Sequence, residues 1–295
     1  MANSEIDAVR ELLAARAESR GESLEEMRAG IDALADVFPT PKDVSVEPVR
    51  AGGVPGEWIR APGATAERAL LYLHGGGYVI GSVTSHRTLI ADLSRASGRG
   101  ALGIDYRLAP EHPFPAAVED AVAGYRWLLE QGFQPADIAI AGDSAGGGLA
   151  LATLVALRDE GVSLPGAAAC ISPWVDLEGV GDSMQANAGI DPMVNREGLL
   201  VMAEHYLAGS DPRNPLAAPL YADLQGLPRL LIQVGSAETL LDDSRRVAER
   251  ARRQGVSVTL EEWPDMIHVW HIFAPILSDG RRAIERIAEF LRNGH

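Results

Sequence analysis

Ser144 has the clearest chemical signature in the chain. It is the central residue of the pentapeptide Gly-Asp-Ser-Ala-Gly at 142–146. The apolar residues 138–141 predict a buried strand before it, and residues 147–159 predict a helix after it. A serine on such a sharp strand-to-helix turn is held outward by strained backbone and needs small neighbours. The helix N-terminus beneath it offers free N–H groups where an oxyanion would form, so the pattern predicts hydrolytic acyl transfer.

A serine nucleophile needs a general base, which on this type of turn follows the serine and an acid along the chain. The chain has seven histidines: His74, His86, His112, His205, His268, His271 and His295. Only the last three follow both Ser144 and a downstream acid. His295 is terminal, and His271 is better placed in the helix that follows. His268 lies in the loop between the last predicted strand and the final helix, so we predict His268 as the base.

The acid that orients the histidine is expected after the next-to-last strand, predicted at 230–234. Three carboxylates follow that strand, those of Glu238, Asp242 and Asp243. Glu238 is favoured because it lies directly at the strand end. The two aspartates lie at the start of the next helix, where carboxylates cap free N–H groups. Asp242 is the main alternative to Glu238.

A glycine-rich loop supplies a second part of the site. The predicted strand 70–73 runs into His74 and three glycines at 75–77. Glycines allow backbone N–H groups to approach a ligand closely, and this motif is typical of the oxyanion hole of lipases and esterases. We predict Gly76, Gly77 and Ala145 as the N–H donors. His74 is then expected to brace the loop and not to act as a base.

The elements that must position these residues alternate along the chain. Strands are predicted at 70–73, 101–105, 138–141, 167–172, 230–234 and 256–261. Helices are predicted at 85–96, 116–131, 145–159, 244–254 and 276–292. Short apolar strands interleaved with helices predict an α/β fold with a mostly parallel sheet flanked by helices. Upstream, residues 44–50 and 57–60 alternate as an antiparallel strand pair would.

Two segments break this alternation. Residues 180–216 lie between two predicted strands, contain a predicted helix at 195–207 and are longer than a crossover needs. Residues 1–45 carry two further helical patterns, at 6–16 and 24–37. We therefore expect 46–179 and 217–295 to form one catalytic core, capped by 1–45 and 180–216.

Composition excludes several classes of function. The chain has 295 residues, of which 46% are hydrophobic, and a net charge of -15. Nucleic acids and anionic membranes need a basic face, so neither is an expected partner. Cys170 is the only cysteine, which excludes an internal disulfide and a cysteine-based metal cluster, and its apolar surroundings predict a buried filler. No signal peptide or bilayer-spanning stretch is expected, so a cytoplasmic location is predicted.

Four segments together carry a family resemblance: 74–78 (HGGGY), 105–111 (DYRLAPE), 142–146 (GDSAG) and 172–177 (SPWVDL). With them the chain resembles the bacterial hormone-sensitive-lipase-like esterases, a branch of the α/β-hydrolase superfamily, from about Ala69 onward. The resemblance implies a helical cap, no cofactor, a preference for short acyl chains and a possible homodimer through the last strand. It also places Glu238 where most members have aspartate. Segments 106–111 and 172–177 are expected to brace the loop and the sheet end.

The expected function is hydrolysis of a small carboxylic ester. Ser144 would attack the ester carbonyl, His268 would move the proton, and Glu238 would hold the imidazole. An amidase or acyltransferase using the same residues is the nearest alternative. A non-catalytic small-molecule receptor on this scaffold is a second alternative, disfavoured because a histidine and an acid are both present.

Overall fold

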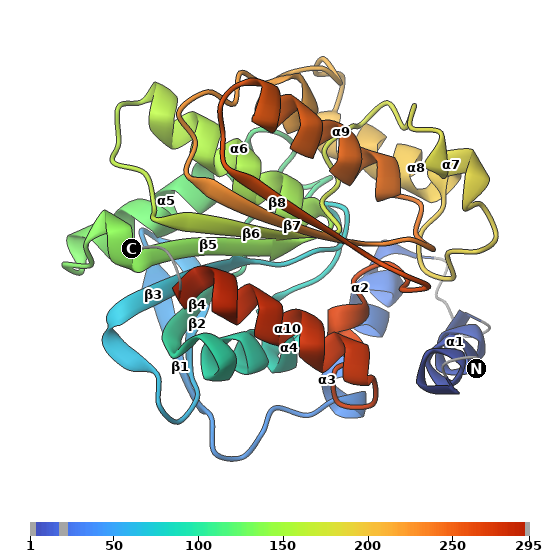
Figure 1. Ribbon diagram of the computed structural model, residues 1–295, viewed down its shortest axis with the longest axis horizontal. Coiled ribbons are helices and arrows are strands. Elements are labelled where there is room, and N and C mark those ends of the chain that lie inside the picture. Colours follow the sequence, from blue (N-terminus) through green and yellow to red (C-terminus); the bar gives the residue numbers. More distant parts are fainter. Residues whose placement is uncertain (1–3, 18–22, 293–295) are drawn as a thin grey trace.

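An eight-stranded sheet forms the centre of the computed structural model, which describes residues 4–17 and 23–292 (Figure 1). The strand order is β1-β2-β4-β3-β5-β6-β7-β8. Pairs β1–β2 and β2–β4 are antiparallel, and the other five pairs are parallel. The strands are β1 Ser45–Ala51, β2 Val54–Arg60, β3 Thr65–Leu73, β4 Arg99–Ile104, β5 Ile138–Asp143, β6 Ala167–Ile171, β7 Arg229–Gly235 and β8 Val258–Trp263. The predicted α/β fold is confirmed.

Helices cover both faces of this sheet. Helices α4 and α10 pack on one face, and α5, α6 and α9 pack on the other (Figure 1). The α-helices are α1 Ser4–Ala17, α2 Leu24–Asp32, α3 Leu34–Val37, α4 Val83–Ser97, α5 Ala116–Glu130, α6 Ala145–Asp159, α7 Ser183–Ala186, α8 Arg196–Leu207, α9 Leu241–Arg253 and α10 Ser278–Arg292. Because β4, β5 and β6 are covered on both faces, every residue in them is buried. Among the described residues, no helix is long and apolar enough to cross a membrane.

Each strand and helix predicted from the sequence is present, with shifted ends. Strand β3 begins at Thr65, five residues before the apolar run, because its first residues are exposed and carry no apolar pattern. The helical pattern at 24–37 divides at Ala33 into α2 and α3. Short elements escaped prediction: α7 and the 3-10 helices Pro135–Asp137, Pro219–Tyr221 and Trp270–Phe273.

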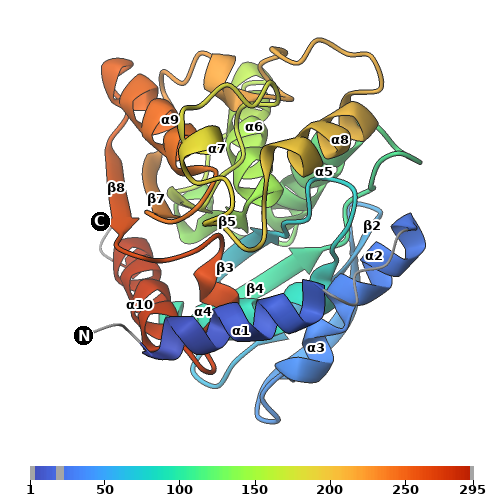
Figure 2. The same ribbon diagram turned by 90° about the vertical axis from the view of Figure 1, so that its right-hand side faces the viewer.

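The helices outside the alternating core gather at one end of the molecule. Figure 2 faces that end, with α1 to α3 below the strand ends and α7 and α8 above them. Helix α1 packs through Ile6 and Val9 into a cluster with Met266, Ile267 and Trp270, which lie on both sides of His268. The N-terminal helix therefore supports the loop that carries the predicted base.

Candidate active site

Ser144 lies on the sharp turn between β5 and α6. Its φ and ψ are 55° and −121°, a strained conformation for a residue with a side chain. Its N–H donates to the carbonyl of Ile171, and its own carbonyl accepts from Gly147 and Gly148. A Cβ on Gly146 would lie 2.0 Å from the carbonyl oxygen of Leu73. The turn therefore needs the small neighbours that the pentapeptide supplies.

His268 and Glu238 form a buried pair. Nδ1 of His268 lies 2.6 Å from Oε2 of Glu238, and the residues are 3% and 0% exposed. The other carboxylate oxygen accepts from the Ser172 hydroxyl at 2.9 Å and from the Gly235 N–H at 2.5 Å. These bonds fix the plane of the carboxylate and thereby that of the imidazole. Since Nδ1 faces Glu238, Nε2 is the ring nitrogen left to accept a proton.

The electrostatics of the pair favour a protonated imidazole. Burial lowers the pKa of His268, but the hydrogen bond with Glu238 and its negative charge outweigh burial, so the pKa lies above its usual value. Burial raises the pKa of Glu238, and the hydrogen bonds from His268 and Gly235 offset part of that rise. The carboxylate therefore stabilises an imidazolium, the state that a general base reaches after taking a proton.

The two alternative acids are occupied elsewhere. Asp242 accepts from the N–H of Ser183 at 2.8 Å, and Asp243 accepts from the N–H of Val175 and Asp176 at 3.1 and 3.0 Å. We expected both to cap their own helix. That expectation is wrong, because α9 has no side-chain cap and the two carboxylates bind backbone from other segments.

The remaining histidines lie in other environments. Nε2 of His271 lies 2.7 Å from Oε1 of Gln233, and burial lowers its pKa to about 3. His271 lies in a 3-10 helix and not in α10. His112 and His205 are exposed, and His295 lies outside the described residues. His74 is buried with a pKa lowered to about 3, which keeps it neutral.

The glycine loop after β3 presents backbone N–H groups beside the serine turn. Gly76 and Gly77 have φ of 111° and 63°, which side-chain-bearing residues rarely adopt. A Cβ on Gly76 would lie 2.1 Å from the Ile80 carbonyl, and one on Gly77 would lie 2.1 Å from Sδ of Met202. Within the described part of the chain, no acceptor binds the N–H of Gly76, Gly77 or Ala145. These three N–H groups thus have no acceptor among the described residues, as the predicted oxyanion hole requires.

The sequence and the structure of this chain are both similar to those of known proteins. A family model described as the alpha/beta hydrolase fold matches residues 70–272. An acetyl-hydrolase from Streptomyces hygroscopicus is 50% identical, with 99% of this chain and 97% of that protein covered. The solved structure of an esterase from the bacterial hormone-sensitive lipase (HSL) family is 52% identical, with a TM-score of 0.98 over 100% of this chain and 99% of that chain.

The chain belongs to the bacterial HSL family of α/β-hydrolases. It is an esterase of the serine hydrolase class. The protein EstE5 is also similar, at 50% identity and a TM-score of 0.95, with 99% of each chain covered, in a structure soaked by p-nitrophenyl butyrate. A further structure is designated EstE5-PMSF, at 49% identity and a TM-score of 0.94, again with 99% of each chain covered.

In this HSL-family chain, the segment 106–111 braces the glycine loop, as expected. The Tyr106 hydroxyl donates to the His74 carbonyl at 2.7 Å, and the two rings stack with centroids 4.2 Å apart. The N–H of Ala109 donates to the carbonyl of Tyr78. Arg28 of α2 donates to the carbonyls of Val79 and Ala109. The loop is thus held by a neighbouring segment and by an N-terminal helix.

Sequence reasoning missed the part played by Ser172. We expected its segment only to brace the sheet end. Its hydroxyl donates to Oε1 of Glu238 and accepts from the Val269 N–H at 3.2 Å, so one side chain links the acid to the histidine loop. Its φ of 45° is uncommon for serine. No local pattern reveals this contact, because Ser172 and Val269 are 97 residues apart.

Residues of the segment 180–216 also hold the acid loop. Nδ2 of Asn187 donates to the Glu238 carbonyl at 2.7 Å. Asp191 accepts from the Thr239 N–H at 2.9 Å, and its charge contributes to raising the pKa of both Glu238 and His268. The same segment therefore positions Glu238 and adds negative charge near the pair.

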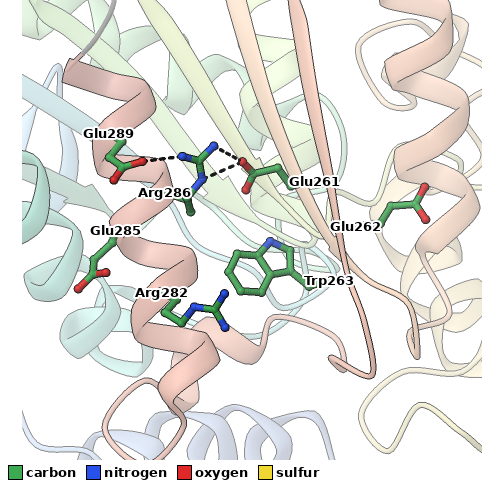
Figure 3. Close-up of a pocket in the computed structure, with 7 residues that line it drawn as sticks. All are labelled: Glu261, Glu262, Trp263, Arg282, Glu285, Arg286 and Glu289. Atoms are coloured by element: carbon green, nitrogen blue, oxygen red, sulfur yellow. Dashed lines mark hydrogen bonds and ion pairs between the residues drawn. The ribbon is translucent and has the colours of Figure 1, made fainter.

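A separate groove lies along β8 and α10, where Figure 3 shows Arg286 between Glu261 and Glu289. Its volume is about 470 Å³. The lining residues are Glu261, Glu262, Trp263, Arg282, Glu285, Arg286 and Glu289. None of the predicted catalytic residues lines it, so this groove is not the predicted active site.

Proposed function

We propose that this esterase hydrolyses short-chain carboxylic esters through an acyl-enzyme on Ser144. The observation that carries the proposal is the buried Glu238–His268 pair, 2.6 Å apart, in a chain whose serine lies on a strained turn beside three free N–H groups. Two relatives support the ester class and the short acyl group. One is an acetyl-hydrolase, and the other, EstE5, was soaked by p-nitrophenyl butyrate, whose acyl group has four carbons.

In the proposed acylation step, Oγ of Ser144 attacks the carbonyl carbon while its proton moves to Nε2 of His268. The carbonyl oxygen becomes an oxyanion that accepts hydrogen bonds from the N–H groups of Gly76, Gly77 and Ala145. When the C–O bond to the alcohol breaks, His268 returns the proton to the departing oxygen. Glu238 holds the tautomer with the proton on Nδ1 throughout.

Deacylation repeats the same proton transfers with water. His268 takes a proton from a water molecule as its oxygen attacks the acyl carbon, and the second oxyanion uses the same three N–H groups. Collapse releases the carboxylic acid and returns the proton to Oγ of Ser144. The chain's own side chains account for every proton moved.

We also propose that residues 1–45 and 180–216 form a cap that limits the acyl pocket, while 46–179 and 217–295 form the core. Met202 of α8 supports this division, because its sulfur occupies the space beside Gly77. Helices α1 to α3 and α7 and α8 also lie at the same end of the molecule (Figure 2). We infer that this thioether beside the oxyanion loop limits the size of the acyl group.

We further propose a homodimer formed through β8. Within the described residues, β8 pairs only with β7, so its outer edge is free to pair with a second copy. Light scattering over a range of protein concentrations tests the dimer, and a monomer mass at every concentration would contradict it.

A cytoplasmic location is a further proposal. Cys170 is the sole cysteine and is buried, so the chain cannot form an internal disulfide. Its fold therefore does not depend on the oxidising environment in which disulfides form, which agrees with a cytoplasmic location. Cell fractionation with an antibody against the chain tests this location.

Hydrolysis of p-nitrophenyl acetate, butyrate, octanoate and palmitate tests the proposed function. Wild type should turn over the acetate and butyrate best, and Ser144→Ala should abolish turnover of all four. Turnover that survives in Ser144→Ala would overturn the proposal, as would a preference for palmitate.

A further inference from the structure

A second buried acid–histidine pair lies behind the serine turn. Asp143 precedes Ser144, and Oδ2 of its carboxylate lies 3.2 Å from Nε2 of His86 on α4. Both residues are 2% exposed. Oδ1 accepts from the Tyr72 hydroxyl at 2.7 Å and from the Gly75 N–H at 3.1 Å. The proposed mechanism assigns this pair no role.

The hydrogen-bond partners of His86 accommodate a ring that carries two protons. The Ser85 hydroxyl oxygen lies 2.9 Å from both the Ser82 carbonyl oxygen and Nδ1 of His86, so it can donate its single proton to the carbonyl and accept from Nδ1. The Ser82 carbonyl, 3.2 Å from Nδ1, can likewise only accept. Nε2 faces the Asp143 carboxylate. We therefore assign His86 and Asp143 as an imidazolium–carboxylate pair, in which both ring nitrogens donate.

The charges around the pair agree with that protonation. Burial lowers the pKa of His86, but the charge of Asp143 and its hydrogen bond outweigh burial and raise it. Burial raises the pKa of Asp143, and the charge and hydrogen bond of His86 reverse that effect and lower it. A buried pair whose remaining donors and acceptors are all bonded is stable as ions.

The pair binds both ends of the glycine loop. At the start of the loop, the Gly75 N–H donates to Asp143, and a Cβ on Gly75 would lie 2.2 Å from Oδ2 of that carboxylate. At the end of the loop, the Ser82 carbonyl faces Nδ1 of His86. Gly76 and Gly77 lie between these two anchors. Asp143 is also the residue next to Ser144, so one ion pair connects the loop to the nucleophile.

We propose that the His86–Asp143 ion pair is a positioning pair for the oxyanion hole, which sets where the N–H groups of Gly76 and Gly77 lie relative to Ser144. The inference rests on the proposed function, because the oxyanion forms only if the chain carries out acyl transfer on Ser144. Neither side chain is placed in contact with substrate. The pair acts through the loop, so its loss weakens binding of the oxyanion and leaves binding of the neutral ester unchanged.

The test compares His86→Gln and Asp143→Asn with wild type in three measurements. These are kcat and KM for p-nitrophenyl butyrate, the inhibition constant of an alkyl trifluoromethyl ketone, and the melting temperature. The ketone forms an oxyanion when the serine adds to it. A misplacement of about 1 Å can cost on the order of 10²-fold in rate, so we expect kcat to fall about 10- to 100-fold with KM within about two-fold. The ketone inhibition constant should rise in parallel with the loss of kcat.

Two hydroxyl deletions give a graded variant and a matched control. Tyr72→Phe removes one donor to Asp143 and leaves the ion pair, so a smaller loss of kcat is expected. Tyr125→Phe removes a similar hydroxyl, which donates to the Ser163 carbonyl away from the loop, and should keep kcat. A lower melting temperature with unchanged kcat and ketone inhibition in His86→Gln and Asp143→Asn would overturn the proposal. The proposal would also be overturned if KM and the ketone inhibition constant rose by the same factor, because binding of the neutral ester would then be weakened as much as binding of the oxyanion.

Failure of this inference is distinguishable from failure of the proposed function. If the positioning role is wrong, wild type still hydrolyses butyrate and Ser144→Ala does not. If the proposed function is wrong, wild type itself shows no turnover that depends on Ser144.

Discussion

Oε2 of Glu238 lies 2.6 Å from Nδ1 of His268, while the other oxygen of the same carboxylate is held by Ser172 and Gly235. A carboxylate with both oxygens engaged holds the imidazole in one orientation. The longer glutamate side chain reaches the histidine from a loop that Asn187 and Asp191 hold in place. In the proposed triad, neighbouring residues therefore hold the acid in place.

Glu238→Gln should lower kcat by about 10²- to 10⁴-fold, because an amide can present N–H to Nδ1 and stabilise the wrong tautomer. Steady-state kinetics on p-nitrophenyl butyrate measures this loss. Asp242→Asn is the matched control and should keep kcat within about three-fold, because Asp242 binds the Ser183 N–H and not the histidine. An active Glu238→Gln together with an inactive Asp242→Asn would move the acid to Asp242.

The acid limb of the pH profile should lie above the usual histidine pKa. His268 acts as a base only when neutral, and the net effect of burial and of Glu238 is to raise its pKa. Activity should therefore fall as pH drops through a value above about 6.5, the usual pKa of histidine. The pH dependence of kcat/KM measures the limb. A rate flat from about pH 5 to 8 would argue against His268 as the base.

Asp191→Asn should move that acid limb to lower pH. The Asp191 charge contributes to raising the pKa of His268, so neutralising it makes the imidazolium less stable. The proton is then lost at a lower pH, and activity persists further into acid. A limb that stays in place or moves up in Asp191→Asn would contradict this electrostatic account.

Ser172→Ala should lower both activity and stability. The variant removes the donor to Oε1 of Glu238 and leaves the Val269 N–H without its acceptor. An unsatisfied buried group of this kind costs about 1–3 kcal/mol of unfolding free energy. We expect kcat to fall about ten-fold, since the imidazole loses part of its orientation. Urea denaturation and kinetics measure the two effects, and wild-type kcat in Ser172→Ala would show that Glu238 needs no such support.

Alanine at the two oxyanion glycines should have different consequences. A Cβ on Gly76 meets the Ile80 carbonyl, which is backbone, whereas a Cβ on Gly77 meets the end of the flexible Met202 side chain. Gly76→Ala should cost about 10²- to 10³-fold in kcat, the size of a lost oxyanion donor. Gly77→Ala should recover part of its loss when combined with Met202→Ala. No recovery in the double variant would show that backbone strain, and not the contact, limits Gly77→Ala.

The local patterns of the chain account for much of this structure. The apolar runs at 138–141 and 167–171 are short and flanked by glycine and proline, so β5 and β6 are predictable. Ser144 follows from its pentapeptide, and the position of His268 follows from chain order once a strand is assigned before it. Glu238 required a choice among three carboxylates, which distance from the strand end decided.

The remaining features depend on contacts between distant segments. Asn187 and Asp191 reach the acid loop across about fifty residues, and no periodicity connects them. The first residues of β3 are exposed and lie at a register irregularity between Thr65 and Ala69, so no apolar pattern marks them as part of a strand. The positions of the two aspartates in α9 predict helix capping, but both carboxylates instead accept hydrogen bonds from backbone N–H groups of other segments. In the sequence, no pattern distinguishes His86 from other residues of its helix, and only the fold places it beside Asp143.

The acyl-enzyme itself is the most direct test of the account. Wild type mixed briefly with p-nitrophenyl butyrate, quenched in acid, digested and analysed by mass spectrometry should show one butyryl group on the peptide that carries Ser144. His268→Ala should show much less of that adduct. An active wild type that never carries a butyryl group on Ser144, or carries it on another residue, would contradict the central claim.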